Sequence, residues 1–116
     1  MSEHEQQIKA GRLTAGMSFS ERVWAVTARV PRGRVVTYAD IARRLGTKGY
    51  RAVGHALHRN PYAPAVPCHR VVGKDGRLTG FAGGLAKKRR LLEGEGVAMA
   101  GDERVDLPRS RYGGRL

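Results

Sequence analysis

The sequence predicts a small, mostly helical α/β domain in which two short helices form a helix-turn-helix and a short β-hairpin follows. Three observations lead to this fold class. The chain has 116 residues, the size of one domain with a single core. Two helical patterns, at 38–45 and 50–59, are separated by a tight glycine-containing turn at 47–49. Short β-prone runs then surround an Asp-Gly turn at 75–76.

The ends of the chain differ in composition from its middle. Residues 1–17 are polar and without a clear period, so we expect a flexible N-terminal segment. Ser18 or Ser20 can cap a first helix, which a proline-containing turn ends. The folded domain is expected to span residues 18–100, and an arginine- and glycine-containing C-terminal tail to occupy 101–116.

Three further elements are expected after the helix-turn-helix. The segment 60–67 carries three prolines and therefore forms a loop. The β-prone runs 71–72 and 78–81 are predicted to pair as the short hairpin around the Asp-Gly turn. A short basic helix at 86–93 closes the domain.

The charge of the chain indicates a polyanionic partner. Lys and Arg number 22 against 10 Asp and Glu, which gives a formal net charge of +12, and Arg has the planar fork that suits phosphate. No long basic amphipathic helix favours a membrane surface instead. With no apolar run long enough to span a bilayer and no secretory signal, we expect a cytoplasmic protein without membrane contact.

Cys68 is the one cysteine, so an internal disulfide and a structural zinc site are both excluded. It is therefore a small buried residue or a reactive thiol. A thiol reacts as thiolate and needs a base; His69 is adjacent, and contact through a water fits an extended segment. Glu93 and Glu95 follow the last helix and could orient the imidazole. A structural cysteine beside a surface histidine is the alternative interpretation.

The sequence predicts neither a metal nor a cofactor. His55 and His58 are three residues apart on an expected helix, which is a spacing that metal ligands can use. The sequence indicates no third ligand near them, and zinc sites need three or four protein ligands. We expect no metal site.

Several short blocks stand in a characteristic order along the chain. They are Gly33-Arg34-Val35-Val36-Thr37-Tyr38, Arg51-Ala52-Val53-Gly54, Asn60-Pro61, Pro67-Cys68-His69-Arg70-Val71-Val72, Gly83-Gly84-Leu85, Lys88, Leu91-Leu92 and Glu95-Gly96. With these blocks, the stretch from Phe19 to about Val97 resembles the C-terminal domain of methylated-DNA–protein-cysteine methyltransferases, or O6-alkylguanine-DNA alkyltransferases, which alkyltransferase-like proteins share. The resemblance implies a winged-helix-like helix-turn-helix DNA-binding domain. Its implied partner is double-stranded DNA containing O6-alkylguanine.

The resemblance implies a chemical role for four residues. Cys68 would accept the alkyl group from O6 of guanine by in-line displacement and keep it as an irreversible thioether. His69 would take the thiol proton through a water, and Glu95 would hold the imidazole tautomer. Asn60 would fix the turn beneath the site.

The resemblance also implies how DNA is held. Arg51 would enter the duplex and fill the gap left by the extruded base, and Tyr38 would press on the phosphate of the flipped nucleotide. The second helix would face the minor groove, whose degenerate pattern suits repair in any sequence context. Ala52 and Gly54 are small and let that helix approach closely.

The implied pocket for the flipped base has several walls. Val71 and Val72 would form one wall, together with Pro67 and the strand that reaches Phe81. Lys88, grouped with the DNA-binding residues, would lie beside the pocket.

Three departures from the family pattern affect the expected function. Phe81 stands where the family has a tyrosine, and the lost hydroxyl weakens guanine readout by roughly 1–3 kcal/mol. Full alkyltransferases usually carry an N-terminal domain, which the short polar segment before Phe19 cannot be. The size and the tail segment Arg104-Val105-Asp106-Leu107 look like alkyltransferase-like proteins, which typically have Trp or Ala at the position of Cys68.

Two hypotheses from different classes follow. In the first, the protein is a single-turnover methyltransferase that acts through Cys68. In the second, it is a non-catalytic sensor that binds the lesion and recruits nucleotide excision repair proteins. We expect a monomer in both. A transcription regulator with an ordinary helix-turn-helix leaves the Cys68 segment unexplained.

Overall fold

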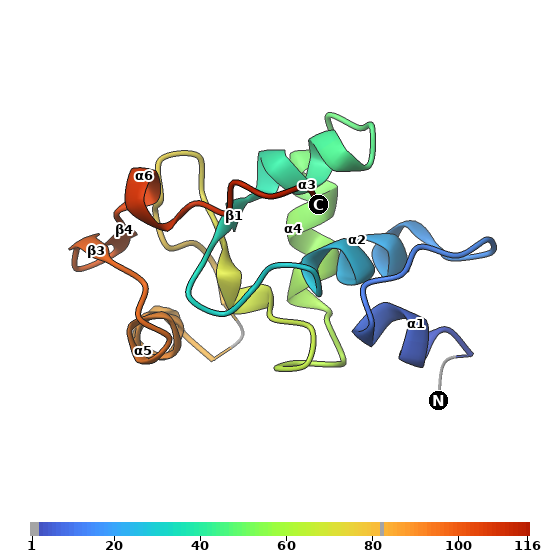
Figure 1. Cartoon of the computed structure of the whole chain (residues 1–116), viewed down its shortest axis with the longest axis horizontal. Coiled ribbons are helices and arrows are strands. Elements are labelled where there is room, and N and C mark those ends of the chain that lie inside the picture. The colour runs from blue at the N-terminus through green and yellow to red at the C-terminus, as the bar shows by residue number, and fades with distance from the viewer. Residues whose placement is uncertain (1–2, 82) are drawn as a thin grey trace.

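The computed structural model describes residues 3–81 and 83–116 (Figure 1). Its helices are α1 (Glu5–Lys9), α2 (Phe19–Thr27), α3 (Tyr38–Arg44), α4 (Tyr50–His58), α5 (Leu85–Gly94) and α6 (Leu107–Ser110), with a 3₁₀ turn η1 (Cys68–Arg70). Its strands are β1 (Val36–Thr37), β2 (Val71–Val72), β3 (Met99–Gly101) and β4 (Arg104–Val105). This composition confirms the mostly helical α/β class. None of the described helices combines the length and the apolar character that crossing a bilayer requires.

The helix-turn-helix is formed by α3 and α4. Thr37 caps α3: its Oγ1 accepts from the backbone N–H of Asp40 at 3.1 Å, and the Asp40 carboxylate accepts from the N–H of Thr37 at 2.9 Å. The turn between the helices uses Gly46, whose φ of +73° is the left-handed conformation that ends helices. The expected helix-turn-helix is therefore confirmed, and α4 is presented on its outer side.

A first hydrophobic core holds this motif together. Ser18 caps α2, since its Oγ accepts from the N–H of Glu21 at 3.2 Å, and α2 packs across α4 and α3. The Trp24 indole N–H donates to the Ala56 carbonyl at 2.7 Å, which ties α2 to α4. Buried core residues on these helices, on the segment after α2 and on the adjoining sheet are Val23, Val26, Val30, Val36, Ile41, Ala42, Val53, Ala56, Leu57 and Val71. Rigid packing of α4 against α2 fixes its outer face.

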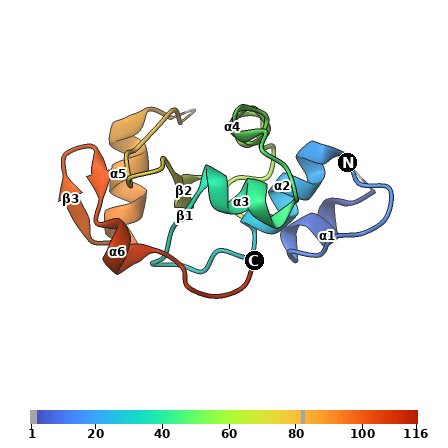
Figure 2. The ribbon, with the colours of Figure 1, turned by 90° about the horizontal axis from the view of Figure 1, so that it is seen from above.

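A second core lies on the other side of the strand pair β1–β2. It contains Val35, Val72, Leu78, Leu92, Val97 and Val105, and α5 with the β3–β4 hairpin closes it. Figure 1 and Figure 2 both show β1 and β2 between the α2–α4 group and the group of α5, α6 and β3. The small sheet therefore joins two halves.

The expected hairpin between 71–72 and 78–81 does not form. Val71 and Val72 do not pair with 78–81 but run parallel to β1, with Val36 opposite Val71 and Thr37 opposite Val72. Both valines are fully buried, a pattern typical of parallel strands covered on both faces. The antiparallel hairpin is β3–β4, within the segment 99–105.

The Asp-Gly signal does mark a turn, and it packs against β4. Gly76 has a φ of +90°, and a Cβ there would lie 2.5 Å from the Val105 carbonyl oxygen. Glycine is therefore required at Gly76 by conformation and by space. The Leu78 N–H donates to the Glu103 carbonyl at 2.7 Å, so the chain after the turn is held by the β3–β4 hairpin.

Both terminal segments pack on the domain, in contrast to the expected flexible segment and loose tail. Ile8 of α1 is fully buried against α2, and the Arg29 guanidinium donates to the Gly11 carbonyl at 2.6 Å. At the other end, the Tyr112 N–H donates to the Val35 carbonyl at 2.8 Å. Ile8 is the single apolar residue of the short α1 and gives no periodic signal, which is why the sequence pattern missed this helix.

Candidate functional site

Cys68 stands at the start of η1, at the end of the proline-rich loop. The preceding Val66 and Pro67 are buried, the Cys68 N–H donates to the Val66 carbonyl, and the Arg70 N–H donates to the Pro67 carbonyl, both at 2.9 Å. These bonds turn the chain sharply where the side chain emerges. The thiol is free and half-buried, and it lines a cavity.

The cavity at Cys68 has a volume of about 170 Å³. Sites for drug-sized molecules occupy about 300–1,000 Å³, so this space suits a single flat base. Its walls come from three parts of the chain. Helices α3 and α4 contribute Tyr38, Gly54, Leu57 and His58; the loop contributes Asn60 and Ala63; the segment leading into α5 contributes Gly80, Phe81, Gly83 and Lys87.

A wider groove of about 500 Å³ adjoins this cavity. Both hollows are lined by Tyr38, Gly54, His58 and Gly80, so the cavity is reached from the groove. The groove runs along the outer face of α4, where Arg51 also lines it. The sulfur is therefore reached from the surface that the helix-turn-helix presents.

The outer face of α4 is suited to close approach by a large partner. Arg51 and Ala52 in the first turn of the helix are exposed, and a Cβ at Gly54 would meet nothing within 4 Å. Within the described residues, the Arg51 side chain makes no hydrogen bond or ion pair. A free guanidinium beside small residues can reach into a groove of nucleic acid.

His69, Arg70 and Glu95 form a buried polar cluster beneath Cys68. The His69 Nε2 lies 3.0 Å from the Glu95 Oε2, and Arg70 donates to both oxygens of the same carboxylate, from Nε at 2.9 Å and from Nη2 at 2.7 Å. Arg70 also donates from Nη1 to the Val30 carbonyl at 2.8 Å. Burial alone would raise the pKa of Glu95, but the bonds from Arg70 and His69 outweigh it and lower that pKa. Glu95 is therefore a carboxylate at neutral pH.

His69 is held as a neutral imidazole. Burial is the largest influence and lowers its pKa; Glu95 raises it in part, and the charges of Arg70 and Lys88 lower it further. With Nε2–H donating to the Glu95 carboxylate, Nδ1 is the nitrogen left without a proton. The imidazole is thereby prepared to accept a proton at Nδ1.

Asn60 clamps the loop that delivers Cys68. Its Nδ2 donates to the Val66 carbonyl at 2.8 Å, and its Oδ1 accepts from the Tyr62 N–H at 2.9 Å. The Tyr62 ring in turn packs edge-on against Trp24, with centroids 5.8 Å apart. The Asn60 amide therefore joins both ends of the loop that leads to the thiol and adds to the backbone bonds that hold it.

Tyr38 stands at the opening between cavity and groove. Its hydroxyl is 2.6 Å from the Thr79 Oγ1, which joins α3 to the segment after the Gly76 turn. Burial is the main cause of a raised pKa at Tyr38, so the phenol stays protonated at neutral pH. A protonated hydroxyl there can donate to an anionic group.

Lys88 and the two valines differ from their expected places. Lys88 is only 1% exposed, and its Nζ donates to the Val71 carbonyl at 2.7 Å and the Thr79 carbonyl at 3.1 Å. It therefore cannot reach a DNA phosphate; instead it holds two backbone segments together, and burial lowers its pKa to about 8. Val71 and Val72 lie in the two cores, and neither they nor the buried Pro67 line the cavity, in contrast to the expected pocket walls.

Lys87 is the basic residue of α5 that lines the cavity. Helical spacing could have found it: the half-buried Leu85 and the buried Lys88 and Leu92 share the inner face, which turns Lys87 outward. Leu57, His58 and Ala63 were also missed as lining residues. His58 lies four residues after Gly54 on α4, so helical spacing could have found it as well, whereas Ala63 is an exposed loop residue with no pattern that marks a pocket.

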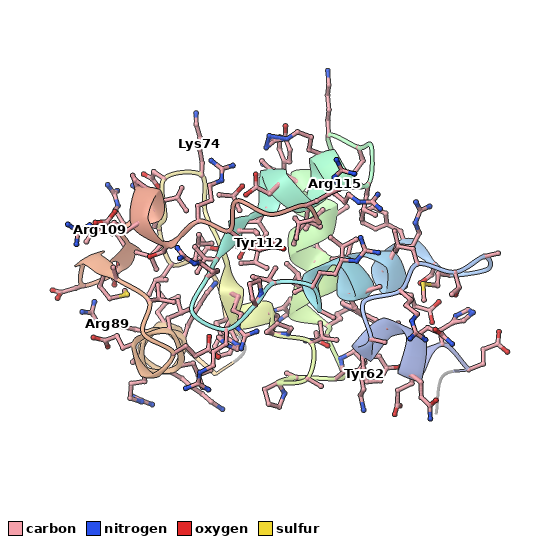
Figure 3. All side chains as sticks on the ribbon, viewed as in Figure 1. Tyr62, Lys74, Arg89, Arg109, Tyr112 and Arg115 are labelled. Carbon is pink, nitrogen blue, oxygen red and sulfur yellow. The ribbon has the colours of Figure 1, made fainter. Side chains whose placement is uncertain are left out.

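Positive charge is distributed widely over the surface. Figure 3 shows the side chains of Lys74 and Arg109 extending away from the fold, on the side opposite the loop that carries Tyr62.

Among the residues that the structure describes, no group of three or more His, Cys, Asp or Glu could hold a metal ion.

The fold and the site define a class: a helix-turn-helix domain with a basic outer face and a thiol in a base-sized cavity beside it. The model of the 6-O-methylguanine DNA methyltransferase DNA-binding domain matches residues 18–97. The chain belongs to this family, which confirms the resemblance found in the sequence.

Named relatives support the same family. The chain is 49% identical over 79 residues to a methylated-DNA–protein-cysteine methyltransferase of Methanosarcina mazei, covering 67% of this chain and 50% of the relative. It is 46% identical over 87 residues to the protein of that name from Salmonella typhimurium, covering 74% of this chain and 51% of the relative. The chain thus spans about half the length of the curated relatives it matches.

Two solved structures are similar to the fold. The Mycobacterium tuberculosis OGT in complex with DNA has 41% identity and a TM-score of 0.66, over 80% of this chain and 63% of that chain. The S. pombe Atl1, in complex with damaged DNA containing O6-carboxymethylguanine, has 30% identity and a TM-score of 0.70. The likeness covers 81% of this chain and 94% of the Atl1 chain. The structural likeness therefore extends to both a transferase and an Atl1 protein.

Proposed function

We propose that this chain binds duplex DNA, turns an O6-alkylguanine out of the helix and transfers the alkyl group to Cys68. One observation carries the proposal: the only thiol of the chain lines a base-sized cavity that adjoins the outer face of a helix-turn-helix. Base flipping is required because the reacting atom cannot be reached inside a stacked duplex.

The transfer is a displacement at the alkyl carbon. His69 takes the proton of the Cys68 thiol through a water, as the resemblance implies, and the resulting imidazolium is stabilised by the Glu95 carboxylate. The sulfur forms a bond to the alkyl carbon while the bond from that carbon to O6 breaks, and the electron pair goes to guanine, which then takes a proton. The thioether has no route back to a thiol, so each molecule acts once.

DNA is proposed to lie along the outer face of α4. Arg51, exposed and without a partner in the described structure, would enter the duplex and occupy the gap left by the flipped base. Ala52 and Gly54 leave room for the backbone to approach, and Tyr38 would donate to the phosphate of the flipped nucleotide. The formal net charge of +12 supplies the sequence-independent part of the affinity.

A lesion sensor is the second candidate function. It is favoured by the likeness to Atl1, 94% of whose chain is covered, and by Phe81, which lines the cavity without a hydroxyl. As a sensor, the protein would bind the flipped base in the same cavity without dealkylating it, and the complex would recruit nucleotide excision repair proteins.

The intact mass of the protein separates the two candidates. After incubation with a duplex bearing O6-methylguanine, transfer adds the mass of one CH2 to the wild-type protein and none to Cys68→Ala. Tight lesion binding with unchanged mass would support the sensor and overturn the transfer. An unmodified duplex of the same sequence is the control for nonspecific binding.

A monomer in the cytoplasm is proposed as the acting form. All groups of the proposed site, from Tyr38 to Glu95, come from one chain, so a second copy is not needed for chemistry. Sedimentation of the protein with and without duplex tests this, since a monomer predicts one chain per lesion site.

A further inference from the structure

Tyr50 is a second exposed feature of α4 that the proposed chemistry leaves unused. It begins the helix directly before Arg51, and 53% of its surface is exposed. Phe19 at 39% is the other large exposed hydrophobic residue in the described chain. The Tyr50 side chain makes no hydrogen bond within that part of the protein, so nothing in the fold accounts for its position.

The Tyr50 ring separates two hollows. On one side lies the groove of about 500 Å³ along α4, which Arg51 also lines. On the other lies a hollow of about 410 Å³ over the turn of the helix-turn-helix, which Arg43 and Lys48 line. Tyr50 lines both and therefore stands as a ridge between them.

The charges on both sides of the ridge favour a polyanion. The Arg43 side chain is 66% exposed although its guanidinium lies 3.0 Å from Asp40, and Lys48 and Arg51 are exposed. Asp40 is itself shared with Arg111, so its charge is already balanced. An aromatic ring between cationic hollows is the arrangement that stacks on bases while phosphates pair at the sides.

We infer that Tyr50 is a second wedge, which enters the minor groove beside Arg51 and stacks on the base next to the gap left by the flipped nucleotide. The strand carrying that base would then pass over the hollow between Arg43 and Lys48. Apolar wedges that unstack one base step are a recurrent means of opening the minor groove, and stacking tolerates any base. The inference rests on the proposed DNA binding of α4.

The test compares three variants by fluorescence anisotropy with a labelled duplex containing O6-methylguanine. Tyr50→Ala should weaken affinity about 10-fold, the scale of one lost base–aromatic stack. Tyr50→Phe keeps the ring and should bind like the wild type. Phe19→Ala removes the other exposed aromatic residue, at the start of α2, and should also bind like the wild type.

Two outcomes would overturn the wedge. Affinity of Tyr50→Ala equal to that of wild type would exclude stacking, and a loss in Tyr50→Phe as large as in Tyr50→Ala would assign the contact to the hydroxyl. Thermal unfolding of each variant confirms that the fold is intact, since the replaced side chains are exposed. The wild-type protein tests the proposed function in the same experiment. If it binds duplex DNA without preferring the lesion, the proposed function fails, but the affinities of the Tyr50 variants still show whether the ring stacks on a base.

Discussion

The Glu95 carboxylate accepts a hydrogen bond from the His69 imidazole across 26 residues of sequence, with Nε2 and Oε2 3.0 Å apart. Arg70 binds both oxygens of the same carboxylate. Glu95, which orients the His69 imidazole, is therefore itself held by Arg70. This cluster joins η1 to the end of α5 and sets the chemistry available to Cys68.

Glu95→Gln is expected to slow alkyl transfer by a factor on the order of 10², because the imidazole loses the charge that stabilises its protonated form. The rate is measured as the appearance of alkylated protein against time at a saturating lesion duplex. Glu93→Gln is the control, since Glu93 pairs only with Arg89 on the surface of α5 at 3.1 Å. Equal rates in the two variants would remove Glu95 from the mechanism.

The pH dependence of transfer follows from His69. The pKa of His69 is lowered from 6.5, mainly by burial, so the neutral imidazole is the major form at pH 6.5. We expect the rate to decline as the pH falls, with a midpoint below pH 6.5, as the His69 imidazole becomes protonated. A decline centred well above pH 6.5 would contradict the assignment of His69 as the base.

Lys88→Met is expected to remove a pH dependence of stability at alkaline pH. The pKa of Lys88 is about 8 in the folded protein and 10.5 as an ordinary lysine, so between these values the unfolded chain binds more protons. The free energy of unfolding of the wild type should therefore rise with pH through that window, by about 3 kcal/mol relative to Lys88→Met. Urea titrations at several pH values measure it, and Lys87→Met, the exposed neighbour, should keep the wild-type slope.

Arg51→Ala is expected to lose lesion preference more than total affinity. The guanidinium would fill the space of the flipped base, whereas much of the remaining binding comes from phosphate contacts spread over the surface. The measurement is the ratio of dissociation constants for a lesion duplex and its unmodified counterpart. Arg90→Ala, on the exposed side of α5, should leave this ratio unchanged.

Phe81→Tyr is expected to strengthen lesion binding by about 1 kcal/mol, roughly fivefold, because a hydroxyl in the cavity could bond the flipped base. Competition between lesion and unmodified duplexes measures the gain. An unchanged preference would mean that Phe81 faces no polar atom of the base.

Local signals in the sequence predicted much of the fold. A capping serine at Ser18 and the glycine at Gly46 mark helix ends within a few residues, so α2, α3 and α4 were predictable, whereas the cap at Thr37 is seen only in the structure. The pairing of β2 was not, because a two-residue strand has no period and its partner β1 lies 35 residues away. The buried Ile8 shows the same limit, since burial depends on distant partners.

The site divides in the same way. The reactive segment around Cys68 was recognisable because thiol, imidazole and guanidinium are consecutive, and the resemblance to a known family added Glu95 and Asn60. The place of Lys88 was not recognisable, since a lysine is expected at the surface and only the geometry of two carbonyls explains its burial. The cavity wall at Ala63 arises from loop geometry that no pattern encodes, and the wall at His58 depends on how the end of α4 meets that loop.

The central claim is that the damaged base occupies the cavity at Cys68, and a crystal structure of Cys68→Ser bound to an O6-methylguanine duplex tests it most directly. The account predicts the methylated base between Phe81 and the α4 wall, with its methyl group toward residue 68 and the Arg51 side chain inside the duplex. A complex in which that base remains stacked in the helix and the cavity holds no nucleotide would contradict it.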